Sequence, residues 1–328
     1  MAFSTSTIPV TCRLSKPLPS GTIDSHMHII PPNFEKFPVL PTAQYKPTPH
    51  TLADAERFYR QDSGLGIATP RLVLTQVSVY GHDNSALLDS VAKLGSNARG
   101  VIECDPNSIT VDDLESWWSQ GVRGVRINLV SVGRSMTEDE LRETLQAYVD
   151  KLARHELRAD KKWVVEMFLP LKMIPLLANV LPDIRNGRQV RWCLDHFGGL
   201  KMASDAANFG PSDDPHTIPG FTELVRVISD KAMPEVYLKI SAPYRIDPEY
   251  PSSKALKKLD RIGMELVAKA EDRLMWASDW PHTRFENIDS KPFVESCYSW
   301  CGEGQEGEER RLKLFRLNSE LLWDMASS

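Results

Sequence analysis

Histidines and aspartates that can do chemistry stand at the ends of apolar runs in this sequence. His26 and His28 lie two residues apart in the segment Asp24-Ser-His26-Met-His28. Side chains at this spacing on a strand point to one face, and two converging imidazoles suit a divalent metal. The pair alone is weak evidence, because two histidines at this spacing also occur on surfaces or as hydrogen-bonded core groups.

Two further apolar runs end in residues of the same kinds. Asp195-His196-Phe-Gly-Gly follows one run, and Asp279-Trp-Pro-His282 follows another. A lone aspartate after a strand is more often a helix cap or turn residue, but three run ends that carry His or Asp make coincidence less plausible. Asp279 is the best candidate for a general base, since a carboxylate beside imidazoles can take a proton from water. We interpret His282 as a candidate substrate contact.

Cationic and amide side chains near other run ends favour an anionic substrate. In the segment 121–128, Arg126 and Asn128 share a face with each other, and Arg245 follows a later run. A guanidinium suits a carboxylate because its planar fork binds two oxygens at once. Pairing with carboxylates of the protein stays open as the alternative, above all for Arg123.

Two more polar residues are candidates for the site. His82, in Tyr80-Gly-His82-Asp83-Asn84, comes just after an apolar run and is expected within reach of the substrate. Glu166 interrupts an apolar run, and a buried carboxylate is costly without a cation or a metal beside it. We therefore expect Glu166 either to join the two histidines of the first motif and Asp279 around a metal or to pair with an arginine.

The elements that must position these residues alternate between strands and helices. Apolar runs predict eight strands, at 21–29, 71–79, 100–104, 122–130, 163–168, 190–196, 236–241 and 274–279. Helices are expected at 51–64, 84–97, 111–120, 137–156, 171–181, 220–232, 254–270 and about 306–325. Such alternation implies parallel pairing, and eight units predict a single-domain α/β fold, a (β/α)8 TIM barrel over 21–328, after an arm at 1–20. An open doubly wound sheet is the alternative, but the glycine-rich phosphate turn that it would want is missing.

Composition excludes several classes of function. The chain has 328 residues with 39 Lys+Arg and 44 Asp+Glu, a formal net charge of −5, which argues against nucleic-acid binding through net positive charge. No apolar run approaches the ~18 residues of a membrane span, and the first residues lack the pattern of a secretory signal. The five cysteines form no zinc-knuckle pattern. We therefore expect reduced, mostly buried thiols and a cytoplasmic location.

The motifs DSHMH, YGHDN, GVRGVRIN, DHFGG, KISAPYR and WASDWPH occur in this order over most of the chain. Together they resemble the amidohydrolase superfamily, in the branch of the 2-pyrone-4,6-dicarboxylate lactonases and related lactonases. The resemblance implies a (β/α)8 barrel and hydrolysis of a ring ester. It also implies a catalytic centre made of His26, His28, His196 and Asp279. Arg126 and Arg245 match positions that hold a substrate carboxylate in that branch.

Two departures from the branch bear on the substrate. The pyrone dicarboxylate lactonases carry a tyrosine on the fifth strand, where an ungapped match places Met167. They also carry a basic residue a few positions after the GxRGxRxN motif, where this chain has Val130, Ser131 and Val132. Part of the grip on a dicarboxylate is therefore missing, which argues against pyrone dicarboxylate itself.

We expect a hydrolase that opens a small carboxylated or oxygen-rich lactone. Asp279 would deprotonate water, and the three histidines would stabilise the oxyanion, with or without one divalent ion, for which Zn²⁺ is the first expectation. The alternative is a metal-dependent decarboxylase of a small aromatic or unsaturated acid. The expected partner is a small anionic molecule, not a nucleic acid or a membrane, and self-association into a homo-oligomer is a further hypothesis.

Overall fold

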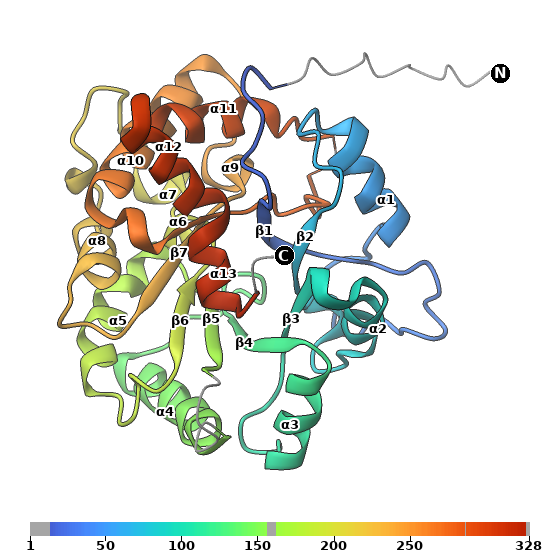
Figure 1. Cartoon of the computed structure of the whole chain (residues 1–328). Helices are drawn as coiled ribbons and strands as arrows, with labels where there is room; N and C mark the ends of the chain where they lie inside the picture. Colours follow the sequence, from blue (N-terminus) through green and yellow to red (C-terminus); the bar gives the residue numbers. More distant parts are fainter. Residues whose placement is uncertain (1–13, 156–161, 286, 326–328) are drawn as a thin grey trace.

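Eight parallel strands pair in chain order and form the sheet that the sequence predicts. The structure is a computed structural model that describes residues 14–155, 162–285 and 287–325 (Figure 1). The strands are β1 (Ile23–Met27), β2 (Arg71–Thr75), β3 (Ala98–Ile102), β4 (Val122–Asn128), β5 (Val164–Phe168), β6 (Arg191–Leu194), β7 (Val236–Ile240) and β8 (Leu274–Trp276). A parallel bridge between Met27 and Trp280 brings the first and last strands together. The (β/α)8 barrel is confirmed, and the open sheet is wrong.

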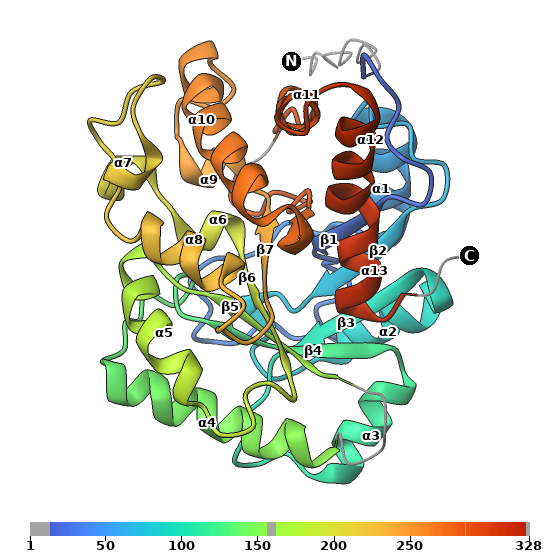
Figure 2. The same cartoon turned by 60° about the vertical axis from the view of Figure 1, so that its left-hand side comes forward.

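Helices surround the sheet, and most of them lie where the sequence predicts helices (Figure 2). They are α1 (Leu52–Arg57), α2 (Ser85–Leu94), α3 (Val111–Ser119), α4 (Glu138–His155), α5 (Ile174–Val180), α6 (His196–Gly199), α7 (Met202–Asp205), α8 (Phe221–Ser229), α9 (Pro243–Ile246), α10 (Ser253–Ala270), α11 (Lys291–Trp300), α12 (Gly304–Leu312) and α13 (Asn318–Trp323). The expected last helix consists of α12 and α13 joined by a π-helical turn, Lys313–Leu317. The short helices α6, α7 and α9 and the longer α11 were not predicted.

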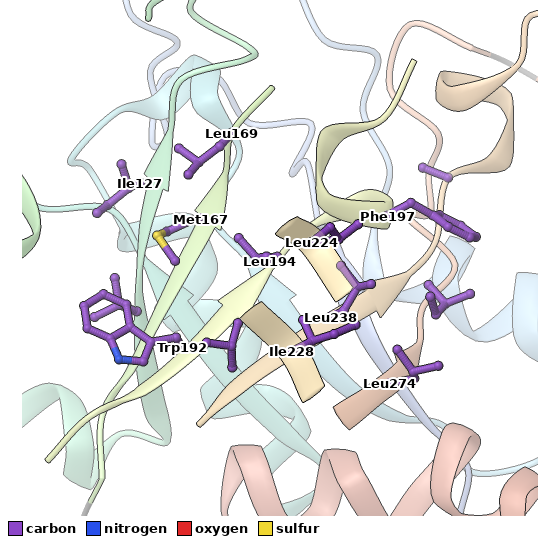
Figure 3. Close-up of a cluster of buried hydrophobic side chains, with 14 of the residues drawn as sticks. Ile127, Met167, Leu169, Trp192, Leu194, Phe197, Leu224, Ile228, Leu238 and Leu274 are labelled. Atoms are coloured by element: carbon purple, nitrogen blue, oxygen red, sulfur yellow. The ribbon is translucent and has the colours of Figure 1, made fainter. Parts of the chain in front are cut away.

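Apolar side chains form one core between the strands and the helices and a second inside the barrel. Figure 3 shows Leu194 of the sheet beside Leu224 of α8, with Met167 and Ile127 farther along the sheet, all in the outer core. The inner core lies at the amino-terminal ends of the strands, where Trp323 of α13 is fully buried among strand side chains. α13 thus closes the barrel at the amino-terminal ends of the strands, and the polar site lies toward their carboxyl-terminal ends.

The alternation of side chains along β4 and β5 decides which residues reach the barrel interior. Arg126 contacts polar groups of β5 and the segment after β6, whereas its neighbour Ile127 packs in the outer core. On β5, Met167 packs in the outer core as well. The interior therefore receives Glu166 and Phe168 from this strand, so the residue matched to the family's tyrosine faces away from the site.

Two further findings concern the cysteines and the membrane within the described residues. Cys104, Cys193, Cys297 and Cys301 are buried and free, while Cys12 lies outside those residues. No helix within the described ranges is long and apolar enough to cross a membrane. Of the expected arm, residues 14–20 run beside α11 and α12, where Lys16 forms an ion pair with Glu303 and residues 1–13 are not described.

Candidate active site

Backbone hydrogen bonds at the junction of β1 and β8 bring the first motif next to the last. The Asp24 carboxylate accepts from the N–H of His26 at 3.1 Å and from the N–H of Ser278 at 2.9 Å. The N–H of Asp279 donates to the His26 carbonyl at 3.0 Å. Asp24, which the sequence analysis left without a role, therefore holds the two strand ends in register and sets His26 and His28 beside Asp279.

One carboxylate oxygen of Asp279 lies close to three imidazoles. Its Oδ1 is 3.7 Å from Nε2 of His26, 3.6 Å from Nε2 of His28 and 3.9 Å from Nε2 of His196. All four side chains are buried. The structure thus gathers the four predicted catalytic residues, which come from strand ends far apart in the sequence, around a single point.

The other oxygen of Asp279 is held by the segment that follows β7. The Tyr244 hydroxyl donates to Oδ2, and so does Nε of Arg245 at 2.7 Å. Burial alone would raise the pKa of Asp279, but Arg245 and the neighbouring histidines outweigh it and hold that pKa well below its usual range. Asp279 is therefore ionised, oriented through one oxygen, and free to accept a proton at the other.

Left-handed backbone conformations occur just after the carboxyl ends of β6, β7 and β8. His196, Ala242 and Asp279 have φ values of 47°, 53° and 59°. Such conformations cost roughly 1–3 kcal/mol each and concentrate at functional sites. The last glycine of the DHFGG motif is required for a steric reason as well. Gly199 has φ +75°, and a Cβ there would lie 1.8 Å from the Leu169 carbonyl oxygen.

A fully buried lysine that the sequence analysis did not single out lies at the centre of the barrel. Lys239 of β7 donates to Glu166, and its Nζ lies 3.2 Å from Asp195 Oδ1 and 2.9 Å from His26 Nδ1. Burial would lower the pKa of Lys239, but Asp195 and Glu166 outweigh it and raise that pKa. The available signal was a lysine inside the apolar run VYLKI, which resembles the way Glu166 interrupts its own strand.

Arg126 completes this network of buried charges. Its Nη1 donates to the Gln76 carbonyl at 3.0 Å, and its Nη2 donates to Asp195 Oδ2 at 3.2 Å. Its Nε lies 3.5 Å from Glu166 Oε1. Glu166 therefore pairs with an arginine, which was one of the two expectations, and with Lys239. It does not belong to the groups of described residues that can share a metal.

The hydrogen-bond partners of the imidazoles assign their protons. Nδ1 of His28 is 2.7 Å from the Thr75 carbonyl, which only accepts, so this nitrogen carries the proton and Nε2 keeps a lone pair. The Lys239 ammonium only donates, so Nδ1 of His26 accepts and Nε2–H faces Asp279. Nδ1 of His196 meets the Ser241 hydroxyl at 2.7 Å, which allows either arrangement.

Burial keeps two of these histidines neutral. It lowers the pKa of His196 to about 4 and, with the Lys239 charge, lowers the pKa of His26 well below its usual value. At neutral pH the site therefore contains an anionic Asp279 beside uncharged His26 and His196.

The residues present can hold a divalent ion. Ligand atoms of His26, His28 and Asp279 lie within 4.8 Å of one another, as do those of His26, Asp195 and His196. Within the part of the chain that the structure describes, His26 Nε2 has no hydrogen-bond partner. Coordination through this atom requires its lone pair, so Nδ1 of His26 would have to donate to Asp195 Oδ1, 3.3 Å away, instead of accepting from Lys239.

A narrow cavity opens in front of these groups. His28, His196 and Asp279 line it from the barrel, and Arg245 lines its rim. Phe168 lies edge-on to His196, with ring centroids 4.8 Å apart, and forms part of the wall. A substrate carbonyl that enters this cavity would meet His28, His196 and Asp279.

Three of the remaining predicted substrate residues, Asn128, His282 and His82, are not among the residues that line this cavity. Asn128 accepts from the Ser131 N–H at 3.0 Å. His282 is buried behind Tyr244, with ring centroids 5.4 Å apart. His82 is exposed and lines a neighbouring cavity.

Arg123 is not brought to the site. Its Nε donates to Asp324 Oδ2 at 3.1 Å, and its guanidinium lies 4.1 Å from the ring centroid of Trp118. Both contacts belong to the outer, amino-terminal side of β4. Arg123 therefore pairs with a protein carboxylate, which was the alternative to substrate binding. The same is true of Arg126.

Comparison with known proteins agrees with the fold. The family model for amidohydrolases matches residues 23–323, and the chain belongs to that family. A 2-pyrone-4,6-dicarboxylate hydrolase from Comamonas testosteroni is 28% identical over 282 residues, 83% of this chain and 82% of that protein. A 4-sulfomuconolactone hydrolase from Hydrogenophaga intermedia is 25% identical over 306 residues, 93% of this chain and 89% of that protein. A D-galactarolactone isomerase from Agrobacterium fabrum is 26% identical over 274 residues, 84% of this chain and 81% of that protein.

Solved structures show the same fold. A protein from Pseudomonas putida, described as a 2-pyrone-4,6-dicarboxylic acid hydrolase, has a TM-score of 0.70 and 25% identity, over 94% of this chain and 99% of that one. An apo structure from Agrobacterium tumefaciens has a TM-score of 0.71 at 23% identity and supports the fold alone, over 95% of this chain and 98% of that one. The branch named from the motifs is the branch in which these relatives lie.

Proposed function

We propose that this protein hydrolyses the ester bond of a small lactone. The observation that carries the proposal is the geometry of Asp279, with one oxygen held by Tyr244 and Arg245 and the other facing three imidazole Nε2 atoms. Hydrolytic lactone chemistry in two of the compared relatives supports it. None of those relatives is named as a decarboxylase, so that alternative has less support.

The side chains divide the reaction among themselves. Asp279 takes a proton from water through Oδ1, and the water oxygen attacks the lactone carbonyl carbon. His26 Nε2–H donates to the developing oxyanion, and His196 does so when Ser241 donates to its Nδ1. His28, with its lone pair at Nε2, accepts from the attacking water. The ring C–O bond then breaks, and the carboxyl of Asp279 returns its proton to the leaving oxygen.

A single divalent ion fits His26, His28 and Asp279 when His26 donates its Nδ1 proton to Asp195. Two nitrogen ligands and one oxygen ligand suit Zn²⁺, which in such a site polarises a carbonyl and favours ionised water. Metal analysis of protein purified without added metal tests this. We expect the variant His26→Ala/His28→Ala to lose any ion that the native protein holds, and turnover by native protein with under ~0.1 equivalent of metal would contradict a required ion.

The substrate is a small carboxylated or oxygen-rich lactone, and we propose a cytoplasmic protein that needs neither nucleic acid nor a membrane to act. A panel of lactones and of aromatic acids tests the reaction class. We expect release of one proton for each lactone that is opened and no carbon dioxide from any acid. Carbon dioxide release without proton release from any lactone would replace hydrolysis with decarboxylation.

A further inference from the structure

A second cavity, which we call the side cavity, continues from the narrow cavity in front of Asp279. Ser78 and Ser131 line both of them, and the side cavity extends past these serines to Tyr80 and Glu103. Its volume is about 450 Å³, and small-molecule sites commonly have about 300–1,000 Å³. A lactone whose carbonyl reaches Asp279 through the narrow cavity therefore has room for a substituent in the side cavity.

The two cavities differ in the charges that line them. Arg126, Arg245 and Arg284 line the narrow cavity. Within the described ranges no lysine or arginine lines the side cavity, whereas two acids, Asp83 and Glu103, do. A carboxylate placed there would lose water without gaining a cation, and the acids would repel it. The side cavity therefore disfavours an anionic substituent.

Part of the side-cavity wall consists of apolar side chains that remain open to solvent. Leu40 and Val132 line this cavity, although 40% and 44% of their surface is exposed, and Ala43 lines it as well. Apolar surface that is wet in the free protein favours a ligand that covers it with apolar atoms. These side chains therefore favour a substituent that is apolar as well as uncharged.

Backbone contacts fix the place of Leu40 in this wall. The Leu40 N–H donates to the Val79 carbonyl at 2.9 Å, and the Leu40 carbonyl accepts from the Ala43 N–H at 3.0 Å. Gly81 has φ +50°, and a Cβ there would lie 2.7 Å from Leu40 Cδ1. Glycine is therefore required at position 81 both for the backbone conformation and for the approach of the Leu40 side chain.

We propose that the substrate lactone carries an uncharged, apolar substituent, of about the size of a short branched alkyl group or a phenyl ring, which binds in the side cavity. Leu40 and Val132 contact this substituent while the lactone carbonyl faces Asp279. This inference rests on the proposed lactone hydrolysis for the orientation of the substrate, and it adds the chemical class of the substituent.

Binding of lactams separates this inference from catalysis, because an amide in the ring is far less reactive than an ester. The probes are 5-methylpyrrolidin-2-one, 5-(3-methylbutyl)pyrrolidin-2-one and 3-(5-oxopyrrolidin-2-yl)propanoate, each titrated calorimetrically into the full chain. The arms of the last two have the same shape and differ in charge. A buried methylene group is worth about fourfold in affinity, so we expect the 3-methylbutyl lactam to bind at least about tenfold more tightly than the methyl lactam. It should also bind at least about tenfold more tightly than the propanoate.

Variants assign this preference to the side-cavity wall. Leu40→Ala should weaken binding of the 3-methylbutyl lactam by about four- to tenfold and leave the methyl lactam unchanged. Leu321→Ala removes a leucine that is 54% exposed on α13, at the other end of the barrel, and should change neither. Val132→Lys supplies the missing cation and should strengthen binding of the propanoate relative to the 3-methylbutyl lactam.

Three results would overturn the inference: equal or tighter binding of the propanoate by the native protein, an equal effect of Leu40→Ala on the methyl and 3-methylbutyl lactams, or no binding of any probe. The expected lactam preference in a protein that hydrolyses no lactone would instead count against the proposed function alone.

Discussion

The polar site has two halves that differ in how completely their groups are paired. In the inner half, Lys239, Arg126, Glu166 and Asp195 form ion pairs with one another deep in the barrel. In the outer half, Asp279 lines the cavity, and its Oδ1 lies 3.7 Å from His26 Nε2, too far for a hydrogen bond. Charges in ion pairs keep the neighbouring side chains in position, while groups without a hydrogen-bond partner can bind a ligand. The comparison therefore separates residues that position from residues that react.

The largest expected effect is in the outer half. Asp279→Asn removes the proton acceptor but keeps the shape, so kcat should fall by ~10²–10⁴ while the variant stays folded. Lactone turnover and thermal unfolding of the purified variant measure the two quantities. Asp183→Asn, an exposed aspartate on the outer helices, is the matched control. Near-native kcat in folded Asp279→Asn would remove the carboxylate from the mechanism.

The inner half should respond in stability. Lys239→Met leaves two buried carboxylates without their ammonium partner, which costs about 3–5 kcal/mol in the free energy of unfolding. Lys239→Met/Glu166→Gln should recover part of that loss, because one of the uncompensated charges is gone. Urea unfolding measures both, with the exposed Lys93→Met, whose partner is Asp89, as control. If Lys239→Met loses no more stability than the control Lys93→Met, the inner half is not a paired network.

Acid should weaken the protein through histidines that are buried without charge. Burial lowers the pKa of both His196 and His282 to about 4, below the usual 6.5. Between those pH values the unfolded chain binds more protons than the folded chain, so stability falls as the pH falls through this window and the loss is complete below about 4. We expect a loss of about 2 kcal/mol per histidine at pH 5.0 relative to pH 7.5. His282→Gln should reduce the difference, and equal stability at both pH values would contradict the assignment.

The smallest effect is expected from Arg123, in contrast to Arg126 on the same strand. Arg123 faces outward to Asp324, and Arg126 faces inward to Asp195 and Glu166. Arg123→Met should keep kcat/KM within about 3-fold of the native value, since Arg123 contacts Asp324 and Trp118 away from the cavity and an ion pair with an exposed carboxylate contributes little. Arg126→Met should lower both stability and activity. A larger loss in Arg123→Met than in Arg126→Met would reverse the division between positioning and peripheral residues.

The fold and the four central residues could be predicted because each depends on local order in the sequence. Apolar runs mark strands, and polar residues directly after them mark the carboxyl ends that meet at one rim of a barrel. The roles of Arg126 and Glu166 could not be decided, since strand register alone does not show which buried charges are partners. Lys239 was missed although it interrupts the apolar run VYLKI, because the sequence does not show that Glu166 and Asp195 lie beside it.

Arg284 and the cavity beside Tyr80 were missed for a different reason. Both depend on loops whose approach to the barrel mouth follows from tertiary packing: residues near Tyr45 and Tyr80 come from the segments after β1 and β2, and Arg284 follows β8.

Isotope labelling tests the central claim, hydrolysis at the lactone carbonyl by water that Asp279 activates. The best lactone of the panel is turned over in H₂¹⁸O, and the product is analysed by mass spectrometry. The account predicts one ¹⁸O atom in the new carboxylate and none in the released hydroxyl group. Product without ¹⁸O, as in isomerisation or decarboxylation, or ¹⁸O in the hydroxyl group, would contradict it.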